Sequence, residues 1–174
     1  MLDQAHYSAT ETLPDGLTLT IRSQTPNDRE GWLAALARSS AETLYHRFFG
    51  VKREFSEKEL HFFLDIDFIK HVALVVEVEE NGKPTLIGGG RYVTIEPGRA
   101  EVSFALIDDY QHKGIGSVLM RHLAKLAKKA GLKQLVAEVL SDNLPMVTVF
   151  EHSGLPMTLK REGAVIHVTM QVPP

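Results

Sequence analysis

The chain has 174 residues, a formal net charge of −3 at pH 7 and no cysteine. This length suits one domain, and without cysteine neither a disulfide nor a thiolate nucleophile is available. The charge gives no indication of nucleic-acid binding, no apolar run reaches the roughly 20 residues that span a bilayer, and the first residues lack the pattern of a secretory signal, so we expect a soluble, cytoplasmic protein that binds neither nucleic acid nor membrane.

The first third of the chain predicts one strand and three helices. Residues 1–16 are expected to form a flexible N-terminal segment, and residues 17–174 a single domain. Leu17–Arg22 alternates apolar and polar residues, as a half-buried strand does. Thr25 and Pro26 supply an N-cap and a first-turn proline for a helix. Two further helices begin with capping-box spacing, in which a serine is followed three residues later by glutamate: Ser39 with Glu42, and Ser56 with Glu59. Gly50 is expected to end the first of these two helices.

The middle of the chain is rich in predicted strands. Val72–Glu79 and Thr85–Ile95 flank Asn81-Gly82, the strongest short hairpin signal. The triple glycine at 88–90 lies inside the second of these strands, where it indicates a bulge or a close approach of backbones. Glu101–Ile107 alternates again and predicts a third strand.

The last third alternates helices and strands. Ile115–Ala130 places its apolar residues on one face and predicts an amphipathic helix. Leu135–Leu140 follows as an apolar strand, Pro145–Ser153 as a short helix and Val165–Val172 as a last strand. The order β-α-α-(α)-β-β-β-α-β-α-β-β contains a right-handed, parallel strand–helix–strand crossover between residues 101 and 140. The predicted fold is therefore α/β or α+β, with a mixed sheet covered by helices.

Two glycines, Gly114 and Gly116, lie where a strand ends and the long helix begins, in the stretch DDYQHKGIGSVLMRHL. Free N–H groups at a helix N-terminus bind anions. A phosphate-binding loop of the P-loop type would need a lysine after the second glycine, and a dinucleotide fingerprint would need a glycine where Leu119 stands. What remains is the spacing Q-x-x-G-x-G.

This spacing resembles the acyl-CoA loop of the GNAT superfamily of N-acetyltransferases. The stretch NLPMVTVFEHSGL also resembles a family motif, with Asn143 and Gly154 in register. The runs SAETLYHRFFG and ELHFFLDIDFIKHVALVVEV look like the acetyltransferase domain of bacterial protein-lysine acetyltransferases. The resemblance implies a mixed, mostly antiparallel central sheet flanked by helices, with a β-α-β core that binds acyl-CoA. It also implies acetyl-CoA as the acyl donor.

The resemblance assigns the cofactor to the loop and to the strand before it. The pantetheine arm would bind the backbone of Leu106 and Ile107. Asn143 would bind the pantetheine, although an N-cap is an equally good interpretation. The pyrophosphate would bind the N–H groups of the loop, with the Lys113 side chain either adding charge or lying solvated: Gln111, His112, Lys113, Gly114, Ile115, Gly116 and Ser117.

Charge near this loop is one-sided, because residues 110–137 contain no aspartate or glutamate. The segment is either a solvated basic face or, given the resemblance, the rim of a site for an anionic cofactor. Its six cations are Lys113, Arg121, Lys125, Lys128, Lys129 and Lys133.

A lysine ammonium has a reference pKa near 10.4, so at neutral pH a general base must help to remove its proton. The resemblance implies that a glutamate on the strand before the loop has this role. Glu101 is the candidate, with a salt bridge to Arg99 as the alternative interpretation; Glu77, Glu79 and Glu96 are less favoured bases. The tyrosine that many relatives use as general acid is replaced by Phe150, so no acid is assigned unless Tyr45 or Tyr110 reaches the sulfur.

The acceptor is less defined than the donor. Residues 39–70 and 156–164 would form its walls, with aromatic residues that line a groove or belong to the core: Tyr45, Phe48, Phe49, Phe62 and Phe63. The expected acceptor is a protein lysine, for example on an acyl-CoA synthetase. The alternatives are a small amine, amino acid or drug, or a non-catalytic acyl-CoA-binding module. Histidine spacing predicts no metal site, and the oligomer is either a monomer or a homodimer.

Overall fold

A computed structural model describes residues 4–48 and 55–174 of the chain. Its strands form one sheet in the order β1-β2-β3-β4-β5-β6-β8-β7, antiparallel throughout except for the pair β5–β6. The strands are β1 (Ser8–Thr12), β2 (Thr18–Ser23), β3 (His71–Glu80), β4 (Lys83–Glu96), β5 (Arg99–Leu106), β6 (Gln134–Leu140), β7 (Met157–Glu162) and β8 (Val165–Gln171). The α-helices are α1 (Arg29–Ala37), α2 (Ala41–Phe48), α3 (Glu57–Leu64), α4 (Ile115–Lys129) and α5 (Leu144–Glu151), and the short 3₁₀ turns are η1 (Gln4–His6), η2 (Pro26–Asp28) and η3 (Asp108–Tyr110).

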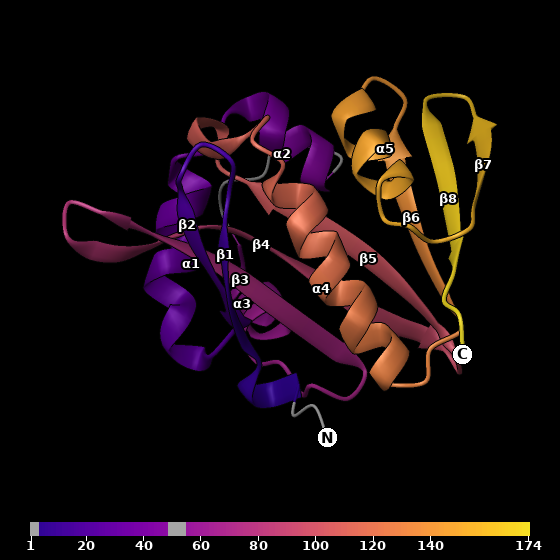
Figure 1. Cartoon of the computed structure of the whole chain (residues 1–174), viewed down its shortest axis with the longest axis horizontal. Coiled ribbons are helices and arrows are strands. Elements are labelled where there is room, and N and C mark those ends of the chain that lie inside the picture. Colours follow the sequence, from indigo (N-terminus) through magenta and orange to yellow (C-terminus); the bar gives the residue numbers. More distant parts are fainter. Residues whose placement is uncertain (1–3, 49–54) are drawn as a thin grey trace.

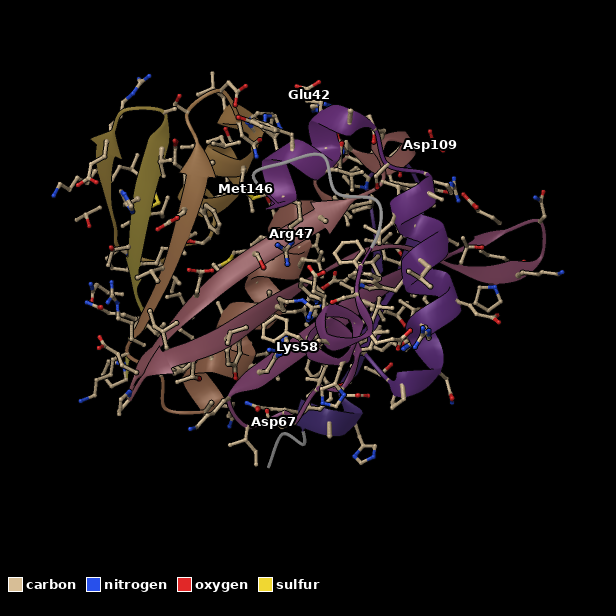
Figure 2. All side chains as sticks on the ribbon, turned by 180° about the vertical axis from the view of Figure 1, so that it is seen from behind. Glu42, Arg47, Lys58, Asp67, Asp109 and Met146 are labelled. Atoms are coloured by element: carbon tan, nitrogen blue, oxygen red, sulfur yellow. The ribbon has the colours of Figure 1, made fainter. Side chains whose placement is uncertain are left out.

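Helices cover both faces of the sheet. Helix α4 crosses one face, with α5 beside it, while α1, α2 and α3 lie behind the sheet in Figure 1 and in front of it in Figure 2. Leucine-rich spacing makes α4 amphipathic, and each fully buried aliphatic side chain contributes roughly 1.5–3 kcal/mol. Its buried face consists of Ile115, Val118, Leu119, Met120, Leu123, Leu126 and Ala127. The mixed, mostly antiparallel sheet flanked by helices is therefore confirmed.

Local sequence signals predict most elements correctly. The capping box of α3 is present, because the Ser56 hydroxyl accepts from the Glu59 N–H at 3.1 Å. Asn81 and Gly82 have φ of 51° and 77°, the left-handed pair that a two-residue hairpin turn requires. Helix α2 differs in its cap. The Ser40 hydroxyl accepts from the Thr43 N–H at 3.2 Å, whereas Ser39 donates to the Ala35 carbonyl. Gly50, the expected end of α2, lies outside the described residues.

The N-terminal segment needs correction. Within residues 4–16, β1 pairs with β2 through five residue pairs, and Tyr7 and Leu13 are buried. This part of the chain is therefore an edge of the sheet and not a flexible segment. Strand β7 is the first of the two strands that the predicted order places after the last helix. The sequence gives it no bounds, because its residues MTLKRE lie almost entirely on the surface and do not alternate in burial.

Strands β5 and β6 separate soon after they meet. Their parallel ladder has three pairs and ends at Glu101 opposite Val136. Beyond that point β5 continues to pair with β4 as far as Leu106, and β6 pairs with β8 as far as Leu140. Figure 1 shows the two strands diverging towards α5. The second half of β5 therefore has an edge that no strand of the described chain covers.

Across residues 4–48 and 55–174, no helix is long and apolar enough to cross a membrane. The same residues contain no group of three histidine, aspartate or glutamate side chains that could hold a metal ion.

Candidate active site

The divergence of β5 and β6 opens a cavity of about 780 Å³. Residues 102–106 of β5 and 137–139 of β6 form its two sides. The loop before α4, the first turn of α4 and the start of α5 close its end, and α2 contributes further wall. Of the predicted cofactor residues, the lining contains Leu106, Gln111, His112, Gly114, Ile115, Gly116, Ser117 and Asn143.

The exposed edge of β5 presents backbone groups of alternate residues. The Ile107 N–H donates to the Ile87 carbonyl of β4 at 2.9 Å. Since successive amides of a strand point to opposite edges, the amides of Val102, Phe104 and Leu106 face the cavity. The prediction for Ile107 is therefore corrected, because its N–H is engaged on the β4 side.

Gln111 holds the loop against its neighbours. Its amide nitrogen donates to the Leu106 carbonyl and to the Thr43 hydroxyl, both at 2.9 Å. One side chain thus ties the loop to the end of β5 and to α2. Its contribution to the site is to order the loop.

The two glycines serve different purposes. Gly114 is the N-cap of α4 with φ of 85°, a left-handed conformation that favours glycine. Gly116 packs against α5, because a Cβ there would lie 3.0 Å from Cγ2 of Val149. With no capping side chain, the first-turn N–H groups lack intrahelical acceptors and point to the end of the cavity. The helix dipole adds partial positive charge there, so this end suits an anion.

The basic segment is a solvated face. The Lys113 ammonium lies 3.5 Å from the Asp15 carboxylate and does not line the cavity. Arg121, Lys125 and Lys128 are exposed and follow α4 away from its N-terminus. At 1.5 Å per residue, Lys128 lies about 18 Å along the axis from Gly116. The interpretation of this segment as the rim of the cofactor site is therefore not supported.

Asn143 and Phe150 occupy the α5 side of the cavity. Asn143 is at the N-cap of α5, but its side chain makes no capping hydrogen bond, so it is available to the cavity. Phe150 is buried, and its ring lies 5.8 Å from that of Phe104. Tyr110 points elsewhere: its hydroxyl donates to Glu80 at 2.5 Å, and burial together with this carboxylate raises its pKa to about 12. Tyr45 is 45% exposed, and among the described residues no tyrosine lines this cavity.

A second, smaller cavity of about 80 Å³ lies on the opposite side of β5, under α1 and α2. Its lining includes both small and aliphatic residues of the sheet, together with Gln24, Trp32 and Arg91. Figure 2 shows Arg47 projecting from α2 over β5. The two cavities share five lining residues and therefore meet beside β5: Thr43, Arg47, Ser103, Ala105 and Leu106.

Glu101 lies close to this junction. It is on the same face of β5 as Ser103, one same-face step or about 6.7 Å away. Its side chain is exposed and lines neither cavity. Burial lowers the pKa of the Arg47 guanidinium to about 10, and the Glu101 carboxylate opposes that shift. The alternative pair with Arg99 is absent from the described contacts, because Arg99 lies 3.4 Å from Glu96.

Sequence reasoning missed a buried polar cluster on this face. The Arg91 guanidinium donates to the Phe63 carbonyl at 3.1 Å, to Nε2 of His71 at 2.9 Å and to the Gln24 side-chain oxygen at 3.3 Å. It also lies over the Phe63 ring, 5.1 Å from its centroid. The available signal was an arginine inside the strand sequence GGGRYV, where a charge is expensive unless it is used.

The predicted aromatic groove is mostly core. Phe63 stacks on Trp32 with ring centroids 5.3 Å apart. Phe62 remains 48% exposed. Phe49 and the Phe48 side chain lie outside the described residues.

Comparisons with known proteins agree with this architecture. The sequence profile of the acetyltransferase (GNAT) family matches residues 38–155. Acetyltransferase PA5475 of Pseudomonas aeruginosa is 36% identical over 126 residues, 72% of this chain and 68% of that protein. Acetyltransferase Pat of Mycolicibacterium smegmatis is 31% identical over 88% of this chain, which spans 46% of that longer protein. The crystal structure of the GNAT domain of S. lividans PAT superposes with a TM-score of 0.83 at 31% identity, covering 94% of this chain and 96% of that domain.

Proposed function

This chain belongs to the GNAT family of acetyltransferases, and on that premise we propose that it transfers the acetyl group of acetyl-CoA directly to the side-chain amine of a protein lysine. One observation carries the proposal. The uncovered edge of β5 leads from the α4 N-terminus to the junction of two cavities, and Glu101 stands beside that junction. An extended thioester could thus reach the junction through the larger cavity, and an amine could reach it from the side of the smaller one.

We assign the donor to the larger cavity. The pyrophosphate binds the first-turn N–H groups of α4, where charge-assisted hydrogen bonds contribute roughly 1.5–3 kcal/mol each. The pantetheine amides pair with the outward backbone groups of Val102, Phe104 and Leu106, as an added strand would. Asn143 contacts the same arm from α5. This orientation directs the thioester towards Ser103, where the cavities meet.

The reaction requires one new bond and one broken bond. The neutral amine attacks the thioester carbon, a C–N bond forms, and the C–S bond breaks as CoA thiolate leaves. The amine must lose a proton, and Glu101 accepts it through a water molecule because its carboxylate stands one same-face step from Ser103. Since no tyrosine of the described residues lines the larger cavity, the thiolate departs without a tyrosine acid.

The choice of a protein lysine rests on similarity. The chain matches the GNAT domain of S. lividans PAT over nearly the full length of both. An acyl-CoA synthetase is the kind of acceptor protein that we propose. A small amine is the second candidate, favoured by the size of the 80 Å³ cavity.

The test of the mechanism is Glu101→Gln, with Glu96→Gln as a matched control on the neighbouring strand. Loss of a general base lowers turnover by roughly 10²–10⁴-fold, while acetyl-CoA affinity stays within about twofold because Glu101 does not line the donor cavity. Turnover is measured with a lysine peptide and acetyl-CoA, and affinity by calorimetry. Equal turnover in Glu101→Gln and Glu96→Gln would remove Glu101 as the base.

The acceptor is tested separately. Acetyl transfer to an acyl-CoA synthetase and to lysine peptides is compared with transfer to small amines, at one acetyl-CoA concentration. Transfer to small amines alone contradicts a protein lysine and leaves the acetyltransferase activity standing.

A further inference from the structure

The smaller cavity has a buried positive charge in its wall. Arg91 is 7% exposed, comes from β4 and lines the cavity together with Gln24. Its three hydrogen bonds use three of the five N–H donors of a guanidinium. All three acceptors are neutral groups, since they are a carbonyl, an amide and an imidazole nitrogen.

The imidazole does not neutralise this charge. Burial, Arg91 and Arg47 together lower the pKa of His71 to about 4, so the ring is neutral at pH 7. Because Nε2 accepts from Arg91, the ring proton lies on Nδ1. Burial and the nearby Arg47 lower the pKa of Arg91 to about 9, which leaves the guanidinium mostly charged at pH 7.

Carboxylates of the neighbouring strand and turn are engaged elsewhere. Arg22 binds both Asp28 and Glu77 at 2.7 Å. Within the described part of the chain, no carboxylate forms an ion pair with Arg91. A buried charge without a counter-charge is costly, and a ligand carboxylate would supply one through charge-assisted hydrogen bonds.

The shape of the cavity limits the ligand. Its lining from the sheet includes the small residues Gly89, Ser103 and Ala105, beside larger ones such as Leu74 and Leu86. A cavity of about 80 Å³ holds a few water molecules, and this space accommodates a carboxylate on a short carbon chain.

Arg91 and Ser103 both line the smaller cavity, at the same level of the β4–β5 ladder. Arg91 is directly opposite Ser103 in that ladder, in a hydrogen-bonded pair whose Cα atoms lie about 5.5 Å apart. Ser103 lines both cavities. The smaller cavity therefore connects Arg91 with the junction, where the thioester carbon is proposed to lie.

We propose that the smaller cavity is a carboxylate site for one substrate of the transfer, with Arg91 as the specificity-determining residue. The proposal rests on the assignment of the donor to the larger cavity. The carboxylate comes from one of two sources. It belongs to the acyl chain of a dicarboxylic acyl-CoA such as succinyl-CoA, or to an amino-acid acceptor whose amine lies close to its carboxylate. In either case the C–N bond forms and the C–S bond breaks as above, Glu101 receives the amine proton, and the carboxylate is unchanged.

Two comparisons on the unmodified chain separate the sources. In the donor arm, kcat/KM is measured with succinyl-CoA and with butyryl-CoA, its neutral four-carbon analogue, at a fixed amine. In the acceptor arm, glycine and β-alanine are compared with ethylamine at fixed acetyl-CoA. One charge-assisted contact predicts a preference of roughly 10- to 150-fold for the carboxylate in one arm. No preference in either arm overturns the proposal.

Variants then test the residue. Arg91→Gln should abolish the preference and Arg91→Lys should retain part of it, whereas Arg99→Gln, which alters a half-buried arginine on the next strand, should leave it intact. The ratio within each variant corrects for lost folded protein. If Arg91→Gln does not fold, Arg91→Lys tests the role of the guanidinium instead. An undiminished preference for the carboxylate substrate in Arg91→Lys excludes recognition by the guanidinium. A preference that survives Arg91→Gln also overturns the assignment.

Calorimetry with acetyl-CoA distinguishes this failure from that of the proposed function. A chain that does not bind acetyl-CoA refutes the donor assignment itself. A chain that binds and transfers acetyl but shows no carboxylate preference refutes the carboxylate site alone.

Discussion

Mild acid should destabilise this protein through His71. The side chain is 8% exposed and accepts a hydrogen bond from Arg91, so the folded chain keeps the ring neutral. Its pKa falls from 6.5 to about 4 on folding, because of burial and the two neighbouring arginines. Between about pH 4 and 6.5, His71 therefore binds a proton in the unfolded chain but not in the folded chain. Stability is lost as the pH falls below 6.5, and the loss levels off below about 4.

The magnitude follows from the size of this shift. A shift of about 2.5 units at 1.36 kcal/mol per unit gives a maximum of about 3 kcal/mol. Between pH 7.5 and pH 5.0 the linkage relation predicts that about 2 kcal/mol of that is lost. This is a large part of the 5–15 kcal/mol that domains have in total.

The assay is urea unfolding at pH 7.5 and pH 5.0 of the unmodified chain and of His71→Gln. Glutamine keeps an acceptor for Arg91 and does not titrate, so the pH-dependent loss should shrink by about 2 kcal/mol in this variant. His152→Gln alters an exposed histidine and should show the full loss. Equal losses in the unmodified chain and in His71→Gln would refute the account of a neutral His71 beside a charged Arg91.

Two glycine substitutions test the packing around the site. Gly89→Ala would place a Cβ 2.4 Å from the Leu74 carbonyl oxygen and should cost at least about 2 kcal/mol in urea unfolding, whereas Gly163→Ala meets no atom within 4 Å and should cost only the roughly 1 kcal/mol of its left-handed φ. In Gly116→Ala the new Cβ would lie 3.0 Å from Val149, and it should weaken acetyl-CoA binding because it shifts the first turn of α4. Calorimetry should show that the double variant with Val149→Ala recovers part of the affinity. A further loss of affinity in the double variant would contradict the steric cause.

Elements with local physical causes were predictable from the sequence. The cap at Ser56, the turn at Asn81-Gly82 and the apolar stripe of α4 each depend on residues within a few positions of one another. Strands β1 and β7 are edges of the sheet and are mostly exposed, so their residues carry little hydrophobic periodicity. Strand β1 is held instead by residues that flank it, Tyr7 and Leu13.

The candidate site divides in the same way. The loop glycines could be found because their spacing is local, whereas Gln24, His71 and Arg91 are up to 67 positions apart and meet only across three strands. The error at Ile107 has a related cause. Sequence alternation shows which face a side chain takes, but the edge that an amide faces depends on the pairing partner, here Ile87.

Strand β5 explains how the proposed donor path, base and carboxylate site can lie close together. Its outward amides, at Val102, Phe104 and Leu106, lie at the edge of the larger cavity. The side chains of Glu101, Ser103 and Ala105 lie on one face of β5, the face on which Arg91 stands opposite Ser103. Because both alternations have a period of two, a one-residue shift in the β4–β5 register would move the amides to the wrong edge and Glu101 to the wrong face together. Two glycines of β4 help to fix the pairing on both sides of that strand, because a Cβ on Gly88 would lie 2.3 Å from the Ala105 carbonyl oxygen and a Cβ on Gly89 would lie 2.4 Å from the Leu74 carbonyl oxygen.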